Sequence, residues 1–296
     1  METRARVALI GLGAMGSRMA RRMLGAGWPL AVFDVRAESV AALAEEGAQG
    51  ADSARQATEG AELVILMVQN TSQAHQALGG PDGALAGMSP ATVLIVMCTL
   101  APGDARGIEQ LAAAHQVEVL DAPVSGGTPG AQGGTLSIMV GGSDQRFQRC
   151  QALLETLGSR VYHVGPNVGD GQSAKMVNQL LCGVHLAAAA EALVLARKAG
   201  LDQSVMLDIV SNSAAGSWMI QNRAHRMVSR SFDEVHSYLA LLAKDMGIVI
   251  DGAAAVSAPT PIAAAARETY KAGTAMGLNN QDDSVIIQVY ERLAGL

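Results

Sequence analysis

The chain has 296 residues, of which 49% are hydrophobic and 16% are charged, and this suits one or two domains with sizeable apolar cores. A formal net charge of −6 without a basic run speaks against nucleic acid or an anionic membrane surface as a partner. The three cysteines are widely spaced and match neither a disulfide framework nor a metal-binding pattern, so a reducing cytoplasm is the expected compartment.

The first half of the chain alternates short apolar runs with helical patterns. It predicts strands at 7–10, 30–34, 63–68, 93–97 and 117–120, with helices such as 14–24, 71–78 and 103–115 between them. A glycine-rich stretch at 125–134 then precedes a strand at 136–140, a helix at 143–157 and a short strand at 161–164. Apolar strands that alternate with helices predict a parallel sheet with helices on both faces. The apolar stretch at the N-terminus is too short for a signal peptide.

The second half of the chain has no strand pattern after residue 168. It predicts a long helix at 171–199, a helix capped by Asp202, and helices at 217–229, 236–255, 261–272 and 283–294. His185 and Glu191 interrupt the longest apolar run, 180–196, which favours a buried helix over a membrane span. Asp282 and Asp283 either cap the last helix or face the substrate pocket of a partner subunit. The sequence therefore predicts an α/β domain over 1–168 and an all-helical domain over 169–296.

The glycines of VALIGLGAMG, Gly11, Gly13 and Gly16, form a GxGxxG motif directly after the first strand. Such glycines permit a tight turn, a close approach of the backbone to a pyrophosphate, and close helix–strand packing. Asp34, at the end of the next strand, can accept hydrogen bonds from ribose hydroxyls and would repel a 2′-phosphate. This pattern favours NAD over NADP, although Arg36 can soften the preference. The alternative is a glycine turn without a ligand.

Two further strand ends point to the same crevice, because ligands of doubly wound sheets bind beyond the carboxyl ends of the strands. Met67 and Val68, followed by Asn70, end one predicted strand, and Thr99 follows another. Thr99 is a candidate contact to the nicotinamide side of a dinucleotide. It is equally a candidate cap for the helix that starts near Pro102, and the two roles are compatible.

The segment DAPVSGG, residues 121–127, also follows a predicted strand. The hydroxyl of Ser125 and the backbone N–H groups of Gly126 and Gly127 would suit a carboxylate, since successive glycine N–H groups form anion-binding concavities. A flexible loop is the alternative. A serine hydrolase is excluded, because the sequence has neither a GxSxG motif nor an evident His–Asp pair.

Lys175 opens an almost wholly apolar helical run and shares one helix face with Asn178 and Gln179. A lysine in such surroundings loses hydration, which lowers its pKa and suits it to move a proton on a substrate hydroxyl. An ordinary surface lysine at a helix start is the alternative. No metal is expected, because the histidines show no ligand spacing and the lysine supplies the acid–base function.

Four segments together resemble the β-hydroxyacid dehydrogenase family: GLGAMG (11–16), DAPVSGG (121–127), GDGQSAKMVNQ (169–179) and AKDMGIV (243–249). They follow the order and spacing of the family, and the resemblance covers nearly the whole chain. It implies a Rossmann-like NAD-binding domain over 1–168 and a helical substrate and dimerisation domain over 169–296, similar to 6-phosphogluconate dehydrogenase. Members commonly form homodimers or homotetramers through the helical domain.

The resemblance also implies roles for individual residues. Lys175 would be the catalytic residue with Asn178 beside it, and Lys244 would reach both cofactor and substrate, with Asp245 close by. The remaining substrate contacts would be Ser125, Gly126, Gly127, Gln179 and Trp218. The residues expected to contact the dinucleotide are Gly11, Leu12, Gly13, Ala14, Met15, Gly16, Asp34, Met67, Val68, Asn70, Thr99 and Lys244.

One departure bears on the substrate. Many members carry two asparagines where this chain has Asn178–Gln179, a pair that resembles the sugar-acid branch with tartronate semialdehyde reductases and L-threonate dehydrogenases. Gln179, Trp218 and Arg223 would suit a polyhydroxylated acid, although Trp218 is equally explained as a packing residue at a helix start. The expected reaction is oxidation of L-threonate at carbon 2. Oxidation of 3-hydroxyisobutyrate, reduction of tartronate semialdehyde and a non-catalytic dinucleotide sensor are the alternatives.

Overall fold

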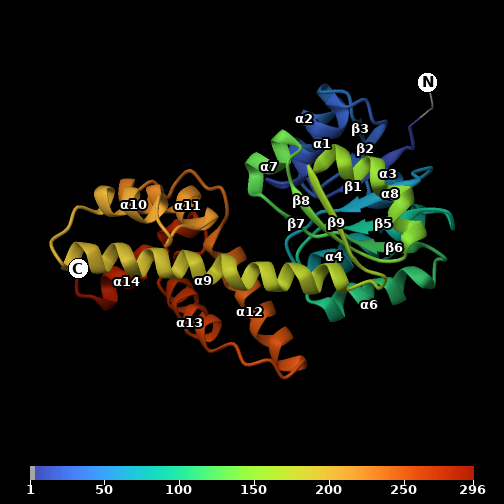
Figure 1. Cartoon of the computed structure of the whole chain (residues 1–296). Coiled ribbons are helices and arrows are strands. Elements are labelled where there is room, and N and C mark those ends of the chain that lie inside the picture. Colours follow the sequence, from blue (N-terminus) through green and yellow to red (C-terminus); the bar gives the residue numbers. More distant parts are fainter. Residues whose placement is uncertain (1–3) are drawn as a thin grey trace. The chain divides into compact units, whose positions relative to one another are not determined.

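The computed structural model describes residues 4–296, and the chain divides into two compact units, Met1–Lys175 and Met176–Leu296 (Figure 1). Residues 1–3, which belong to the stretch assessed for a signal peptide, lie outside the described residues. The division falls inside the long helix α9 (Asp170–Lys198), which begins in the first unit and continues through the second.

Within the described residues, nine strands of the first unit form one sheet in the order β3-β2-β1-β4-β5-β6-β8-β7, with β9 paired to β8. Pairings from β3 through β6 are parallel, whereas β8 is antiparallel to β6 and β7. The expected parallel sheet is therefore correct for its main part and wrong at this edge. The strands are β1 (Val7–Ile10), β2 (Leu30–Phe33), β3 (Gln49–Gly50), β4 (Leu63–Leu66), β5 (Val93–Val96), β6 (Glu118–Asp121), β7 (Val124–Ser125), β8 (Ser137–Gly141) and β9 (Arg160–Gly165).

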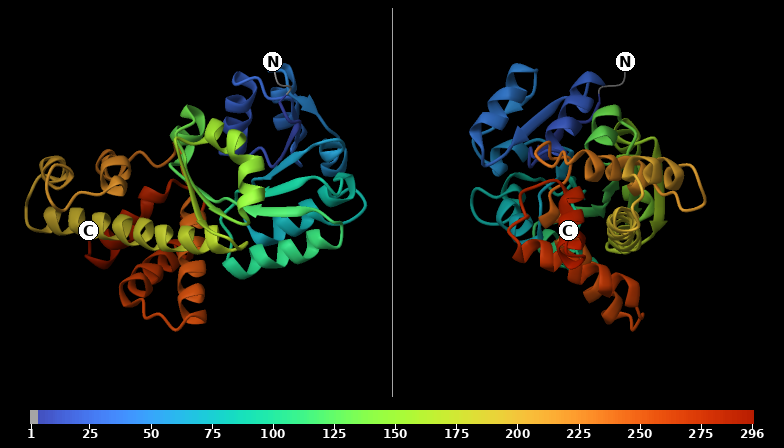
Figure 2. Two further views of the ribbon diagram at one scale, coloured as in Figure 1. Left: turned by 45° about the vertical axis from the view of Figure 1, so that its right-hand side comes forward. Right: turned by 90° about the vertical axis from the view of Figure 1, so that its left-hand side faces the viewer.

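Helices cover both faces of this sheet, as the two views in Figure 2 show. Alternate residues of β1 enter two separate apolar cores, Val7 and Leu9 on one face, Ala8 and Ile10 on the other. The first core is closed by α1 (Gly16–Gly25), α2 (Ala37–Glu45), α7 (Gly127–Gly133) and α8 (Asp144–Leu157). The second is closed by α3 (Ala54–Thr58), α4 (Thr71–Leu78), α5 (Ala84–Gly87) and α6 (Pro102–Ala113). This layering is the predicted Rossmann-like arrangement.

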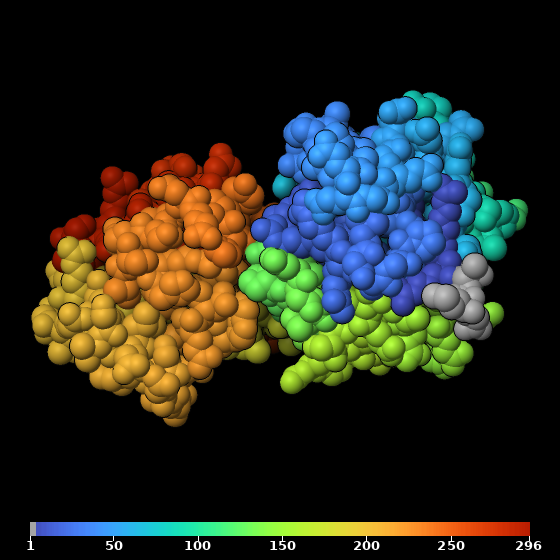
Figure 3. Space-filling model, turned by 90° about the horizontal axis from the view of Figure 1, so that it is seen from above, coloured from blue at the N-terminus to red at the C-terminus, as the bar shows by residue number. Residues whose placement is uncertain are grey.

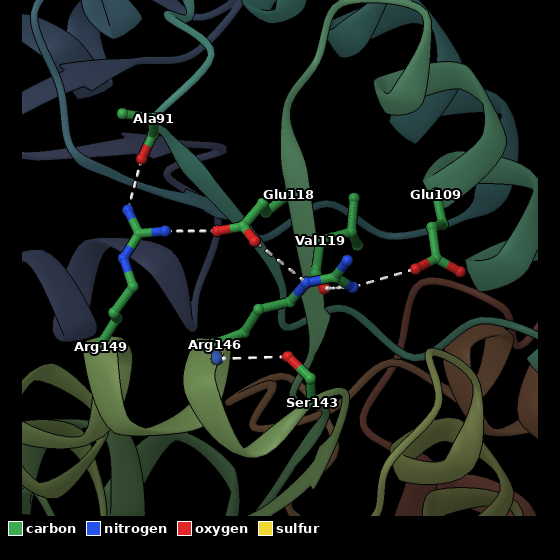
Figure 4. Close-up of polar contacts among 7 residues, drawn as sticks. All are labelled: Ala91, Glu109, Glu118, Val119, Ser143, Arg146 and Arg149. Carbon is green, nitrogen blue, oxygen red and sulfur yellow. Dashed lines mark hydrogen bonds and ion pairs between the residues drawn. The ribbon is translucent and has the colours of Figure 1, made fainter.

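Charged side chains fix α8 to its neighbours (Figure 4). Arg146 lies 3.1 Å from Glu109 of α6 and donates a hydrogen bond of 3.1 Å to the carbonyl of Val119 in β6. Arg149 pairs with Glu118, the first residue of β6. Because these pairs are partly exposed, each contributes only about 0.2–1 kcal/mol. They set the position of α8 more than they stabilise the fold.

The second unit is helical within the described residues, as predicted. Besides α9 it contains α10 (Gln203–Ser211), α11 (Trp218–Ser229), α12 (Leu239–Ala255), α13 (Pro261–Ala275), the 3₁₀ helix η1 (Asp283–Ile286) and α14 (Ile287–Leu293). A single apolar core joins them. Helix α9 passes close to α12, because a Cβ on Gly183 would lie 2.1 Å from the sulfur of Met246. The buried hydroxyl of Tyr270 donates a hydrogen bond of 2.8 Å to the carbonyl of Gly183.

Helix α9 is long and apolar enough to cross a membrane by length and composition alone, but half of its most apolar window is buried in the fold. Core helices of soluble proteins can be as long and as apolar as this one. Asp202 caps α10 as predicted, accepting hydrogen bonds from the N–H groups of Ser204 and Val205. Asp282 caps the 3₁₀ helix that leads into α14. Its alternative role at a partner's substrate pocket stays a prediction.

Candidate active site

The glycine motif lies at the point where the order of the sheet reverses, between β1 and β4. The N–H of Gly11 donates to the carbonyl of Phe33, and the N–H of Met67 donates to the carbonyl of Ile10, so the carboxyl ends of β2, β1 and β4 meet here. Gly11 has φ +98°, and a Cβ on it would lie 2.3 Å from the carbonyl oxygen of Met67. Only glycine allows this turn.

The other two glycines differ in a way that fits a bound dinucleotide. A Cβ on Gly16 would lie 2.0 Å from the carbonyl oxygen of Gly11, so Gly16 permits close packing of α1 on β1. A Cβ on Gly13 would meet no atom of the chain within 4 Å. The fold therefore leaves space beside Gly13, next to the N-terminus of α1, where backbone N–H groups can cradle a pyrophosphate. The residues present fit a nicotinamide dinucleotide.

Asp34 follows β2 and is engaged by its own chain. One carboxylate oxygen accepts the N–H of Leu12 at 2.6 Å, and the other accepts the N–H of Arg36 at 2.9 Å and its Nε at 3.0 Å. Burial opposes ionisation, but these hydrogen bonds outweigh it and lower the pKa of Asp34. The carboxylate thus stays charged where a ribose would lie, and Arg36 is held beside it.

The residues that follow β4 and β5 differ in whether they cap the next helix. Met67 and Val68 follow β4, but the side chain of Asn70 accepts a hydrogen bond of 2.9 Å from the N–H of Gln73 and caps α4. Thr99 follows β5, and the proposed cap role is wrong, because α6 has Ala101 at its N-cap and no side-chain cap hydrogen bond. Its expected contact to the nicotinamide side stays a prediction.

The substrate segment changes its burial at Ser125. Residues 121–124 are buried, whereas Ser125, Gly126 and Gly127 are half-exposed at the end of β7 and the start of α7. The stretch expected as a glycine-rich loop is thus largely a short helix, which packs against α1 (Figure 3). Gly126 and Gly127 adopt φ +126° and +62°, values that side chains rarely allow. Glycine is therefore favoured at both positions, and the segment passes from a short strand into a short helix.

Lys175 is only 5% exposed, so the alternative of a surface lysine is wrong. It lies in the second turn of α9, whose start is joined to the sheet by two buried residues that sequence reasoning missed. The N–H of Gln172 donates a hydrogen bond of 2.7 Å to Asp121, the last residue of β6. Burial, opposed by backbone hydrogen bonds from Gln172 and Gly169, raises the pKa of Asp121 to about 7. The available signal was that both residues lie inside the family segments, Asp121 in DAPVSGG and Gln172 in GDGQSAKMVNQ.

The second unit brings Gln179, Lys244 and Asp245 together. The carboxamide nitrogen of Gln179 donates a hydrogen bond of 2.6 Å to Asp245, whose other oxygen forms an ion pair of 3.1 Å with Lys244. Asp245 is buried. Asn178 directly precedes Gln179 on α9, and its side-chain oxygen accepts a weak hydrogen bond from Cys182. The bond to Asp245 fixes the nitrogen end of the Gln179 amide, which leaves the oxygen end to act as an acceptor.

Trp218 is half-exposed at the start of α11, and Arg223 lies within 5.8 Å of its ring centre. The Nε of Arg223 is 3.4 Å from the buried carboxylate of Asp283, and its Nη1 donates a hydrogen bond to Asn222. Arg223 is therefore mainly engaged within the unit. Trp218 keeps an exposed ring face, so both its packing role and its substrate role remain open.

Comparison with known proteins shows the same two regions. Residues 6–165 match the family model described as the NAD binding domain of 6-phosphogluconate dehydrogenase. Residues 169–290 match the model described as NAD-binding of NADP-dependent 3-hydroxyisobutyrate dehydrogenase. The matches cover more than half of the chain and join at the start of α9.

Individual relatives agree with these models. The chain is 37% identical to L-threonate dehydrogenase of Escherichia coli over 96% of its length and 94% of the relative. It is 40% identical to 3-hydroxyisobutyrate dehydrogenase of Pseudomonas aeruginosa over 89% and 90% of the two chains. The crystal structure of 3-hydroxyisobutyrate dehydrogenase from Salmonella typhimurium superposes with a TM-score of 0.90 and 36% identity, covering 97% of this chain and 100% of that one.

These similarities speak against the non-catalytic sensor. The glycine turn with open space at Gly13 and the buried lysine on α9 occur in a chain whose relatives are dehydrogenases throughout its length. The protein belongs to the β-hydroxyacid dehydrogenase family and is an NAD(P)-dependent dehydrogenase acting on a CH–OH group.

Proposed function

We propose that this enzyme oxidises L-threonate at carbon 2 to the 2-oxo acid, with NAD as the cofactor and Lys175 as the general base. The observation that carries the chemistry is the buried position of Lys175 on α9. Oxidation of a hydroxyl group requires a base for the hydroxyl proton, and a lysine removed from water can serve. Bound NAD would accept the hydride from the substrate carbon.

The chain's own residues would supply the rest of the site. Ser125, Gly126 and Gly127 are the accessible end of an otherwise buried segment, and we assign them to the substrate carboxylate. The half-exposed hydroxyl and the backbone N–H groups of the two glycines suit an anion. Asn178 follows Lys175 on α9 and would hold the substrate hydroxyl or the lysine, while Lys244 would add positive charge beside the substrate or the cofactor.

The substrate assignment rests on Gln179 and on the relatives. Because Asp245 fixes the nitrogen end of the Gln179 amide, its oxygen is suited to accept a hydrogen bond from a substrate hydroxyl. A polyhydroxylated acid such as threonate offers this hydroxyl, whereas a methyl-bearing acid does not. L-Threonate dehydrogenases are among the relatives of 36–37% identity over almost the whole chain.

The second candidate is 3-hydroxyisobutyrate, favoured by the 40% identity to the Pseudomonas aeruginosa enzyme of that name. The partly buried amide of Gln179, if it accepts a hydrogen bond from a substrate hydroxyl, should discriminate against an analogue without that hydroxyl, because the hydrogen bond is then lost. The two candidates, together with reduction of tartronate semialdehyde, are separated by kcat/KM values measured side by side. We expect the highest value with L-threonate, by at least about tenfold. A higher value with 3-hydroxyisobutyrate would replace our assignment.

The role of Lys175 is tested by Lys175→Ala. We expect turnover to fall at least about 100-fold, the usual contribution of an acid–base group. Lys198→Ala is the matched control, since Lys198 is an exposed lysine at the other end of the same helix. Retention of more than about a tenth of wild-type turnover by Lys175→Ala would disprove the assignment.

We further propose NAD as the preferred cofactor, because the charged Asp34 would repel a 2′-phosphate. A homodimer or homotetramer in the cytoplasm is our proposal for the assembly and compartment. Exposed apolar side chains on α9 and α10 of the second unit support the proposed oligomer, namely Leu181, Leu195, Val205 and Ile209. Within the described residues the three cysteines form no disulfide and one of them is only partly buried, which is compatible with a reducing compartment.

A further inference from the structure

Three segments of the candidate site meet at one residue, Gln172, which is 1% exposed. These segments are the turn around Thr99 after β5, the end of β6 at Asp121, and the start of α9 that leads to Lys175. All of them belong to the first unit. Gln172 lies within the family segment GDGQSAKMVNQ (169–179), but the resemblance gave it no role of its own.

The carboxamide of Gln172 brackets Thr99. Its oxygen accepts the N–H of Leu100 at 3.0 Å, and its nitrogen donates to the carbonyl of Cys98 at 2.9 Å. The side chain thus pairs with the backbone on both sides of Thr99, as a neighbouring strand would. Because both bonds are buried, water cannot replace them without cost.

The backbone of Gln172 is held equally firmly. Its N–H donates to Asp121, which is fully buried and is the first residue of the substrate segment 121–127. The preceding residue, Gly171, lies so close to β8 that a Cβ there would be 2.4 Å from the carbonyl oxygen of Met139. The first turn of α9 therefore cannot shift or rotate on the sheet without breaking several contacts at once.

We propose that Gln172 is a positioning residue that holds the proton-transfer group Lys175 in register with Thr99 and with the substrate segment. The proposal rests on the proposed role of Lys175. Lys175 is three residues beyond Gln172 and so lies on the same helix face. Because the buried amide of Gln172 fixes the first turn of α9, it also fixes the position of the Lys175 amino group. Displacement of a reacting group by about 1 Å can lower a rate about 100-fold.

The test is Gln172→Met in the full-length enzyme with NAD and the best hydroxy-acid substrate. Methionine keeps the length of the side chain and removes both hydrogen bonds. We expect kcat to fall at least about tenfold while the dissociation constant for NADH, measured by fluorescence, changes by less than about twofold. Gln151→Met is the control, since Gln151 is an exposed residue of α8, and its kcat should match that of the wild type.

A second measurement tests the two hydrogen bonds between the Gln172 carboxamide and the backbone on either side of Thr99, here called the clamp, without relying on activity. Amide hydrogen exchange in peptides covering 97–101 should be at least about tenfold faster in Gln172→Met than in the wild type, because the N–H of Leu100 loses its acceptor. If the methionine variant does not fold, Gln172→Glu serves instead. It keeps the acceptor for Leu100 but places an oxygen against the Cys98 carbonyl, so kcat should again fall.

The outcomes separate the two proposals. A kcat within threefold of the wild type, or a parallel loss of kcat and NADH binding, would overturn the positioning role. Should the wild type turn over none of the hydroxy acids, the proposed function fails. The exchange data then decide about Gln172 alone, and unchanged exchange at 97–101 would refute the clamp as well.

Discussion

Replacement of Asp121 by asparagine should make the enzyme more stable at alkaline pH. Asp121 is fully buried and lies at the N-terminus of α9, where its carboxylate accepts the N–H of Gln172. Burial, opposed by backbone hydrogen bonds from Gln172 and Gly169 and reinforced by the nearby charge of Asp170, raises its pKa from 3.8 to about 7. An asparagine keeps an acceptor oxygen for Gln172 but has no proton to release.

The direction and size of the expected change in the free energy of unfolding follow from the raised pKa of Asp121. Below about pH 4 the carboxyl group is protonated in both states, and its contribution to stability is fully present. As the pH rises towards 7, the unfolded chain releases the proton while the folded chain retains it, so the wild type loses stability. A shift of roughly 3 units corresponds to roughly 4 kcal/mol in total, and roughly 3 kcal/mol of it falls between pH 5 and pH 9.

Urea unfolding of the wild type and of Asp121→Asn at pH 5, 7 and 9 measures the difference between their free energies of unfolding. Trp28, which is buried in the first unit, reports on the relevant unfolding if Trp218 of the second unit is replaced by phenylalanine in both proteins. Asp82→Asn, at an exposed position, is the control and should give a constant difference. A constant difference for Asp121→Asn as well would mean that the helix N-terminus keeps this carboxylate ionised, and the reasoning from burial would be wrong.

Three further changes test other parts of the molecule. Asp34→Ala should lower the preference for NAD over NADP roughly 10- to 100-fold, measured as the ratio of kcat/KM values, because a charged hydrogen-bond partner is worth about 1.5–3 kcal/mol. Tyr270→Phe should lower the free energy of unfolding by about 1–2 kcal/mol, since the buried carbonyl of Gly183 loses its hydroxyl donor; an unchanged urea midpoint would contradict this. Asp245→Ala should lower kcat/KM for L-threonate at least about tenfold, whereas the exposed Asp251→Ala on the same helix should not, and equal effects of both would count against the Gln179 contact.

Much of the fold was predictable because its strongest signals are periodic or involve glycine. The apolar runs predicted β1, β2, β4, β5 and β6 to within two residues but missed the short, exposed parallel strand β3, and the 3.6-residue pattern predicted the long helix α9. The glycine motif succeeded for a physical reason, since Gly11 and Gly16 have backbone oxygens where a Cβ would be. By contrast, the sequence did not reveal that β8 runs antiparallel to β6, because burial on both faces leaves the same apolar pattern in either direction.

The helix α7 was missed for a related reason. Its sequence, GTPGAQG, consists of residues with weak helix propensity, so a loop was the natural expectation. Tertiary contacts decide otherwise, because α7 packs on α1 and its Ala131 enters the apolar core. Asn70 illustrates the opposite case, in which a residue at a strand end is used as a helix cap, a role that the predicted helix at 71–78 already suggested.

The candidate site shows where motif-based prediction reaches its limit. Motifs point to groups that bear chemistry, such as Lys175, but they do not say which of their other residues hold those groups in place. Gln172 and Asp121 lie inside two of the family segments and belong to that second kind, because neither has an evident chemical task and both are buried. A buried amide or carboxyl group is costly unless its partners are in place, so its presence beside a motif implies a partner within reach. For this enzyme the partners are the backbone of Cys98 and Leu100 in the turn after β5, for Gln172, and the start of α9, for Asp121. This reasoning depends on the burial of Gln172, and the sequence pattern does not distinguish Gln172 from the other polar residues of GDGQSAKMVNQ.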